Sequence, residues 1–171
     1  MKQLLKVIVA IVILIAVGYG VYLILPDYPH DFVKSVVQPI VDVEAKTRIT
    51  QVQNMSVGIK ELDGVTYKIA LEKNNGSNCW VYDKDETTGQ ETVVYRGNGA
   101  PVNMKDYSDY NGKLYTSASV KFEFIITGNS VEIIPYLNDT KMNIKDGAHV
   151  EQNKEVLQMI VSQLYGGMEE E

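Results

Sequence analysis

The longest stretch without a charged side chain lies near the start of the chain. Residues 7–25 are uncharged and almost entirely apolar. At about 1.5 Å of helical rise per residue, this stretch spans roughly 28 Å, close to the thickness of a bilayer's hydrocarbon core. We therefore predict a transmembrane anchor in residues 1–25, with membrane contact from residue 4 to residue 25.

The charges on either side give this helix a direction. Lys2 and Lys6 precede the apolar stretch, and Asp27 and Asp31 follow it. Basic residues beside a membrane helix tend to stay on the cytoplasmic side. We expect a single-pass protein of the cell membrane, with a cytoplasmic N-terminus and an extracytoplasmic C-terminal domain.

A cleaved secretory signal is the alternative. Ala16 and Gly18 form a small-x-small pair, so that cleavage before Tyr19 would release a secreted binding protein. The apolar region of such signals usually spans about 7–15 residues, however. Here apolar residues continue beyond the pair to Leu25. The length of the stretch favours an uncleaved anchor.

Residues 26–40 are predicted to form a stalk and a short helix. Pro26 and Pro29 prevent the membrane helix from simply continuing. Asp31 is expected to cap the short helix and Pro39 to end it. Four apolar residues share one side of this helix: Val33, Val36, Val37 and Ile40.

Residues 41–166 have the pattern of a domain rich in β-strands. Apolar and polar residues alternate over residues 41–50, which predicts a strand with one solvated face, although a helix through Arg48 also fits. Asp63-Gly64 separates two apolar segments and predicts a hairpin there.

Several later segments also predict strands. Residues 79–83 and 93–96 are short apolar strands, and the sequence GNGAP at 97–101 is expected to end the second one. Residues 114–126 alternate over most of their length, and a Gly-Asn turn joins them to a further strand at 130–137. Proline within that last strand favours an edge position or a bulge.

The last predicted element is an amphipathic helix. Asp146 is expected to cap it and Gly166-Gly167 to stop it, before an acidic tail at 167–171. Its apolar stripe comprises Val150, Val156, Leu157, Ile160, Val161 and Leu164. We predict an α+β fold, in which an N-terminal transmembrane helix precedes a curved, mainly antiparallel sheet of successive hairpins with this helix packed on it. The alternative is a small β-barrel or sandwich with the helix as a lid.

Charge limits the choice of partner. The whole chain has a net charge of −6, and without Lys2 and Lys6 the charge of residues 26–171 is −8. This balance argues against nucleic acid, and against an anionic membrane surface, as the main partner. The single cysteine, Cys79, excludes an intramolecular disulfide.

Cys79 is also the candidate nucleophile. His30, Cys79 and Arg96 occur in an order that resembles the catalytic residues of sortases, which would imply a membrane-tethered cysteine transpeptidase. The residues before Cys79 differ from those that precede a sortase cysteine, and His30 lies before the predicted domain. A pair with His149 would require the fold to bring it to Cys79. We expect Cys79 to be a small core residue, and we predict no catalytic residue.

The acidic segment DKDETTGQE at residues 83–91 is the candidate metal site. It contains four carboxylates with spacings that suit calcium: Asp83, Asp85, Glu86 and Glu91. The helix–loop–helix calcium pattern fails, because Thr88 stands at its glycine position and Val94 at its final glutamate position. We predict a solvated hairpin tip, with no metal and no cofactor.

Tyrosines and aspartates gather in one polar loop. The predicted binding residues are Tyr107, Tyr110, Tyr115, Asp106 and Asp109. Tyrosine rings offer contact area at little entropic cost, and loops on a rigid scaffold often carry function. We therefore predict a membrane-anchored extracytoplasmic binding or assembly domain, without catalytic activity, that engages a protein partner at the cell envelope. The alternative is an enzyme or accessory protein acting on cell-wall polymers, which a groove lined by paired carboxylates would favour.

Overall fold

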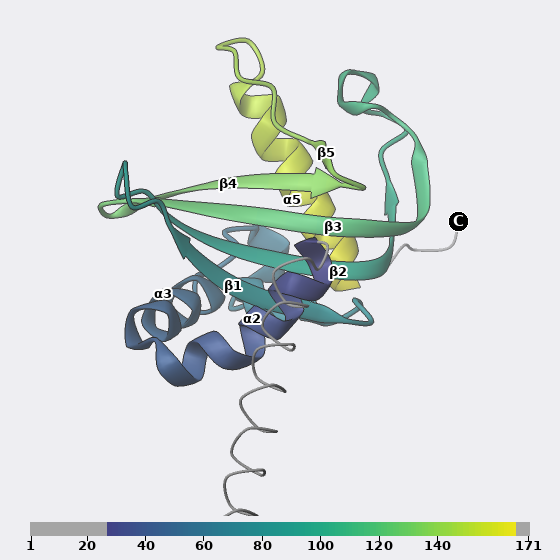
Figure 1. Cartoon of the computed structure of the whole chain (residues 1–171). Helices are drawn as coiled ribbons and strands as arrows, with labels where there is room; N and C mark the ends of the chain where they lie inside the picture. Colours follow the sequence, from purple (N-terminus) through teal and green to yellow (C-terminus); the bar gives the residue numbers. More distant parts are fainter. Residues whose placement is uncertain (1–26, 167–171) are drawn as a thin grey trace, which may run out of the picture.

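The computed structural model of the chain describes residues 27–166 (Figure 1). The predicted anchor at 1–25 and the acidic tail at 167–171 lie outside the described residues. Within the described part, no helix combines the length and the apolar character that crossing a membrane requires.

Five strands form one sheet, and each pairs antiparallel with the next along the chain. They are β1 (Asn78–Lys84), β2 (Glu91–Asn103), β3 (Leu114–Thr127), β4 (Ser130–Leu137) and β5 (Thr140–Lys141). This order confirms the predicted α+β fold with successive hairpins. The sheet is open, with β1 and β5 at its edges, so the alternative of a closed barrel does not apply.

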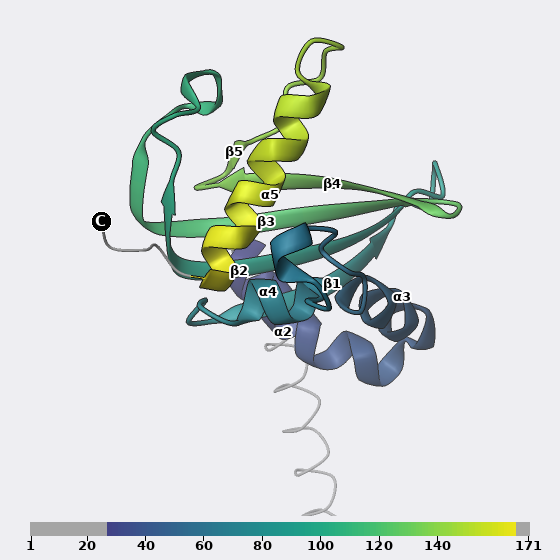
Figure 2. The same ribbon diagram turned by 180° about the vertical axis from the view of Figure 1, so that it is seen from behind.

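Four α-helices accompany the sheet within residues 27–166: α2 (Asp27–Val41), α3 (Val43–Gln53), α4 (Tyr67–Glu72) and α5 (Val150–Gly166). Two short 3-10 turns, η1 (Lys60–Leu62) and η2 (Ser108–Tyr110), lie in the connections. Buried residues of α3, α4 and α5 join those of the sheet in one apolar core. Figures 1 and 2 show α5 on one side of the sheet and α2 on the other, where α2 crosses β1.

Alternation along β3 separates the two faces of the sheet. Phe122, Phe124 and Ile126 are buried and belong to the apolar core. Lys121 and Glu123 point to the opposite face, because successive side chains of a strand alternate. The strand predicted from this alternation is confirmed, as is the hairpin that joins it to β4.

The strand predicted over residues 41–50 is wrong, because most of this segment is helix α3. Asp42 caps the helix, and its Oδ1 accepts a hydrogen bond of 2.9 Å from the Ala45 amide. The buried positions, Ala45, Ile49 and Val52, follow one another at intervals of four and three residues. That is a helical spacing. The apolar positions of this segment therefore fit both the two-residue period of a strand and the 3.6-residue period of a helix, and packing decides between the two.

The predicted hairpin at Asp63-Gly64 is also wrong, although the chain does reverse there. Gly64 has a φ of +75°, and the reversed segments form a single bridge between Ser56 and Thr66. Thr66 then caps helix α4, which occupies Tyr67–Glu72 where the second strand was predicted. Burial of a helical face stabilises this segment more than extending a two-stranded ladder would.

The predicted break at GNGAP does not end β2. The strand continues to Asn103 through register irregularities around Asn98 and Ala100, and Gly99 takes a φ of +88°. Glycine tolerates this conformation, so the segment forms an irregular strand instead of a loop.

The prediction for β4 is confirmed, because its proline lies at an edge. Beyond β4, strand β5 pairs only with Tyr136 and Leu137. The Pro135 carbonyl accepts a hydrogen bond of 2.8 Å from Met142 on that outer side. The missing N–H of Pro135 therefore also faces outward, where it costs no bond to β3.

The termini of two helices differ from the predictions. Helix α2 begins at Asp27, so Asp31 lies inside it and is not its cap, and Pro39 lies before its end at Val41. Asp146 accepts hydrogen bonds from Ala148 and His149 in the turn before α5, which begins only at Val150. Val150 is exposed, whereas the predicted apolar stripe is otherwise buried or half-buried.

Candidate functional site

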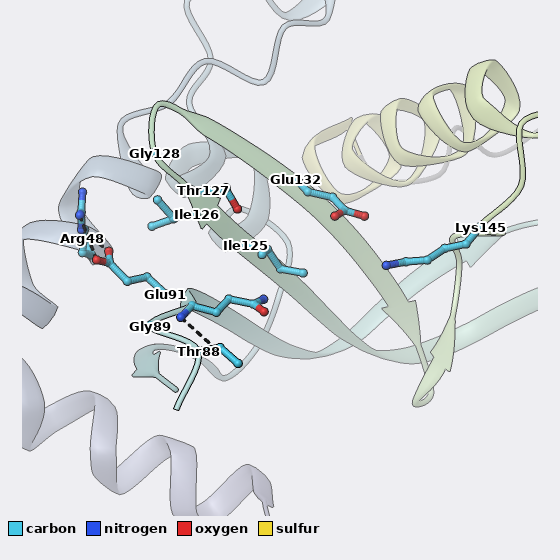
Figure 3. A pocket seen from close by; sticks show the side chains of 11 residues that line it. Arg48, Thr88, Gly89, Glu91, Ile125, Ile126, Thr127, Gly128, Glu132 and Lys145 are labelled. Carbon is cyan, nitrogen blue, oxygen red and sulfur yellow. Dashed lines mark hydrogen bonds and ion pairs between the residues drawn. The ribbon is translucent and has the colours of Figure 1, made fainter. Parts of the chain in front are cut away.

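A groove lies across the ends of the β1–β2 and β3–β4 hairpins (Figure 3). Its volume is about 670 Å³, and its lining comes from α3, both hairpins and the loop before α5. Ile125 and Ile126 of β3 contribute apolar side chains to the lining. Charged side chains also line the groove: Arg48, Glu91, Glu132 and Lys145.

Arg48 of α3 forms an ion pair with Glu91 of β2 at one end of the groove. The Arg48 Nε lies 2.5 Å from Glu91 Oε2, and its second terminal nitrogen donates to Glu91 Oε1 at 3.1 Å. The first terminal nitrogen donates to Gln51 at 3.1 Å, which positions the guanidinium. Such a two-pronged, charge-assisted pair fixes the position of the Glu91 carboxylate at this end of the groove.

Glu132 and Lys145 line the other part of the groove. Figure 3 shows the two side chains extending toward one another, Glu132 from β4 and Lys145 from the loop before α5. Both are exposed to solvent. The groove thus presents charges of both signs beside apolar residues, which suits recognition of a polar chain.

The first half of β4 leaves an open sheet edge next to this groove. The backbone groups of alternate residues point to the same side of a strand. The backbone N–H and C=O groups of Val131 and Ile133 therefore face outward, as the backbone carbonyl of Pro135 does. Within residues 27–166, β5 pairs with β4 only at Tyr136 and Leu137, and Figures 1 and 2 show no element beside the first half of β4. The outward N–H and C=O groups of Val131 and Ile133 are therefore available to an added strand.

Cys79 is buried, with only 4% of its surface exposed. It stands opposite Arg96 in the β1–β2 register, and Arg96 Nε lies 2.5 Å from Asp31 Oδ2 of α2. Burial, with a further contribution from Asp31, raises the pKa of the Cys79 thiol to about 11. The thiol is protonated at neutral pH, which supports the expected role as a core residue.

His30 is closer to this region than the sequence indicated. It belongs to α2, which packs on β1, and its Nδ1 lies 3.7 Å from Asp31 Oδ1. The expectation that His30 precedes the folded domain is therefore wrong. The other histidine, His149, instead contacts Tyr110, Asp109 and Asp146.

Two of the predicted binding tyrosines have structural contacts. Tyr110 and Tyr115 are only 3% and 5% exposed. The Tyr110 hydroxyl donates to Asn153 Oδ1 of α5 at 2.7 Å, which ties the loop to that helix. Tyr107 is half-buried with its ring edge against Tyr110. Of the predicted set, only Asp106 and Asp109 are exposed, and binding by this loop stays a prediction.

His149 joins two loops through the carboxylates of Asp146 and Asp109. This cluster of three side chains was not predicted from the sequence. Its Nδ1 lies 2.7 Å from Asp146 Oδ1, and its Nε2 lies 3.8 Å from Asp109 Oδ2. The Asp146 hydrogen bond raises the pKa of His149, and the same bond lowers the pKa of Asp146. The three-residue spacing of Asp146 and His149 was a visible signal, but the approach of Asp109 depends on the fold.

Carboxylates at the acidic hairpin tip bind other groups of the same chain. Asp83 pairs with Lys34 at 2.6 Å, and Asp85 accepts the Thr87 and Thr88 amides at 2.7 and 2.9 Å. Those amide bonds lower the pKa of Asp85. In the part of the chain that the structure describes, no three His, Cys, Asp or Glu residues are grouped as metal ligands.

Comparison of the chain with protein-family models, with curated proteins and with solved structures gives no match.

Proposed function

We propose that this protein is a membrane-anchored, extracytoplasmic binding or assembly domain that engages a protein partner at the cell envelope without catalysing a reaction. The observation that carries partner binding is the open edge of β4 beside the charged groove. The uncharged stretch at residues 7–25 supports the anchor, and Lys2 and Lys6 before this stretch support an extracytoplasmic location for the domain that follows it.

The open edge is suited to an extended segment of a partner. Unpaired backbone groups at a sheet edge can bond a further strand, and this gives affinity that does not depend on sequence. Glu132 and Lys145 would then select side chains of opposite charge along that strand. The Arg48–Glu91 pair closes one end with fixed geometry.

A cell-wall enzyme is the weaker alternative. The groove does contain two carboxylates, Glu91 and Glu132, as that alternative requires. Glycoside hydrolysis needs one of the two protonated as a general acid, however. Both oxygens of Glu91 are bound by Arg48, and Glu132 extends toward Lys145, so each carboxylate of the groove faces a basic side chain.

Site-specific cross-linking in the source cells tests partner binding. A photoreactive residue replaces Glu132 in the full chain, and the matched control places it at Lys68, an exposed residue of α4. The expected result is one discrete adduct from position 132 and none from position 68. The adduct should disappear in Val131→Pro, which removes an outward N–H, as Pro135 already does in the same strand, and also replaces the half-buried Val131 side chain.

The melting temperature of Val131→Pro shows whether the variant is folded. Adducts of equal yield from both positions, or an adduct that persists in folded Val131→Pro, would contradict binding at this edge. Fractionation of the same cells tests the anchor separately, because the full chain should resist alkaline extraction from membranes.

A further inference from the structure

Helix α2 directs its polar side toward the sheet. Asp31 binds Arg96 of β2, and Lys34 Nζ lies 2.6 Å from Asp83 Oδ1 of β1. Gln38 bonds the edge backbone of β1, since its Nε2 donates to the Tyr82 carbonyl at 2.7 Å and its Oε1 accepts the Tyr82 amide at 2.9 Å. These contacts hold α2 to the domain through polar groups.

The apolar side of α2 faces away from the domain. Its exposed residues are Phe32 (46%), Val33 (41%), Val36 (57%), Val37 (48%), Ile40 (79%) and Val41 (73%), and Val43 (80%) extends the surface at the start of α3. At 100° per residue, the six α2 side chains cover about half of the helix circumference. No residue of α2 belongs to the apolar core among the described residues.

This arrangement inverts the usual orientation of a surface helix, which buries its apolar side and solvates its polar side. A contiguous exposed apolar surface marks contact with a protein or a membrane. The outward side of α2, here called the α2 apolar face, comprises Phe32, Val33, Val36, Val37, Ile40, Val41 and Val43.

The position of α2 in the chain indicates which of these it meets. The uncharged stretch ends at Leu25, and α2 begins at Asp27. If residues 7–25 cross the bilayer, the first turn of α2 lies at the membrane surface. A helix of 15 residues is about 22 Å long, so its whole apolar face stays within reach of that surface.

We propose that α2 lies flat in the outer interface of the bilayer, with the α2 apolar face inserted at the boundary between headgroups and acyl chains. The inference rests on the proposed anchor and adds a second membrane contact to it. Because α2 and α5 lie on opposite sides of the sheet, this contact leaves α5 facing away from the membrane.

The charged residues of α2 indicate which lipids suffice for its insertion. Many interfacial helices add electrostatic attraction to anionic lipids through basic side chains. In α2 the only lysine is Lys34, which is paired with Asp83, and the helix also carries aspartates. Insertion should therefore depend on apolar area alone, occur in zwitterionic lipid and be insensitive to salt.

Depth-dependent fluorescence quenching tests the proposal on the full chain in phosphatidylcholine vesicles. In a Cys79→Ser background, single cysteines replace Val37 or Ile40 and receive an environment-sensitive dye. Lys154→Cys on α5 is the matched exposed control, and Ala16→Cys reports on the anchor. Brominated lipid should quench the dye at positions 37 and 40 as well as 16, with no loss of emission at 154.

Two results would overturn the proposal. Quenching of positions 37 and 40 by an aqueous quencher would place the α2 apolar face in water. Protection from both quenchers would place it against a second copy or another protein. If position 16 is quenched by lipid in either case, the anchor stands and only the α2 proposal fails, whereas loss of quenching at 16 would contradict the anchor itself.

Discussion

His149 gives the domain a titratable link between two loops. Its imidazole lies against Asp146 and near Asp109, and both carboxylates favour its protonated form. Because the pKa of His149 is raised in the folded state, its contribution to stability is complete below the ordinary value of 6.5 and disappears as pH rises through the folded pKa. Asp146 has a lowered pKa and loses its contribution as pH falls below 3.8.

We predict that His149→Gln lowers the melting temperature in mildly acidic solution and has little effect in mildly alkaline solution. The reason is that only the imidazolium attracts both carboxylates. Thermal unfolding of the two chains across pH measures the difference, and NMR titration gives the pKa directly. Asp109→Asn is the control and should remove part of the same difference, whereas an equal effect at every pH would contradict the electrostatic link.

Cys79 should be inert in the folded protein. Its pKa of about 11 leaves almost no thiolate at neutral pH, and its burial blocks approach. A thiol reagent should therefore modify Cys79 slowly in buffer and rapidly in denaturant, as followed by mass spectrometry. Fast modification of the folded chain at neutral pH would show that the thiolate is stabilised, and would renew the nucleophile hypothesis.

At the scale of elements, α2 protects an edge of the sheet through one side chain. The Gln38 amide forms both a donor and an acceptor bond with Tyr82, as a neighbouring strand would. Free sheet edges invite pairing with other chains, so this contact also acts against self-association.

Gln38→Ala should lower the free energy of unfolding by about 1–2 kcal/mol, because two hydrogen bonds are lost. Gln38→Glu is the matched variant, since it keeps an acceptor for the Tyr82 amide but faces the Tyr82 carbonyl with a carboxylate oxygen. We expect it to destabilise the fold at least as much as alanine. Denaturant titration measures both, and an unchanged midpoint for Gln38→Glu would show that the donor bond contributes nothing.

Elements were predicted correctly where the spacing of their apolar residues fits either a strand or a helix, but not both. Over β3, apolar residues at alternate positions continue for too long to suit a helix, and the Gly-Asn turn fixes the partner strand. Helix α4 was missed and helix α3 was only the alternative to a strand, because each is short enough for its apolar positions to suit a strand as well. Their contacts with the core, which no local pattern contains, decide in favour of helix.

At the scale of the whole molecule, the Arg48–Glu91 pair joins α3 to the sheet. The Glu91 side chain is only 15% exposed, so it depends on Arg48 for compensation of its charge. Arg48→Ala should therefore lower the free energy of unfolding by about 1–3 kcal/mol.

The double variant Arg48→Ala/Glu91→Ala provides the control, because it removes the stranded charge together with its partner. It should be more stable than Arg48→Ala alone, as measured by denaturant unfolding. Additive losses from the two single substitutions would contradict a direct pair.

The candidate site shows how far a single sequence reaches. The tyrosine loop was visible as a cluster, but the fold buries Tyr110 and Tyr115 and leaves the aspartates exposed. The groove was invisible, because its charged residues lie far apart in the chain and meet only where α3, two hairpins and a later loop converge.

Spacing along a single segment was enough to predict the alternation of β3, the apolar stripe of the last helix and the apolar side of α2. The direction in which α2 turns depends instead on contacts with the folded sheet. Asp83 and Arg96 on the sheet attract Lys34 and Asp31, and β1 offers its edge to Gln38, so the polar side turns inward. Contacts between distant segments depend on three-dimensional proximity, and they leave the apolar side of α2 facing outward.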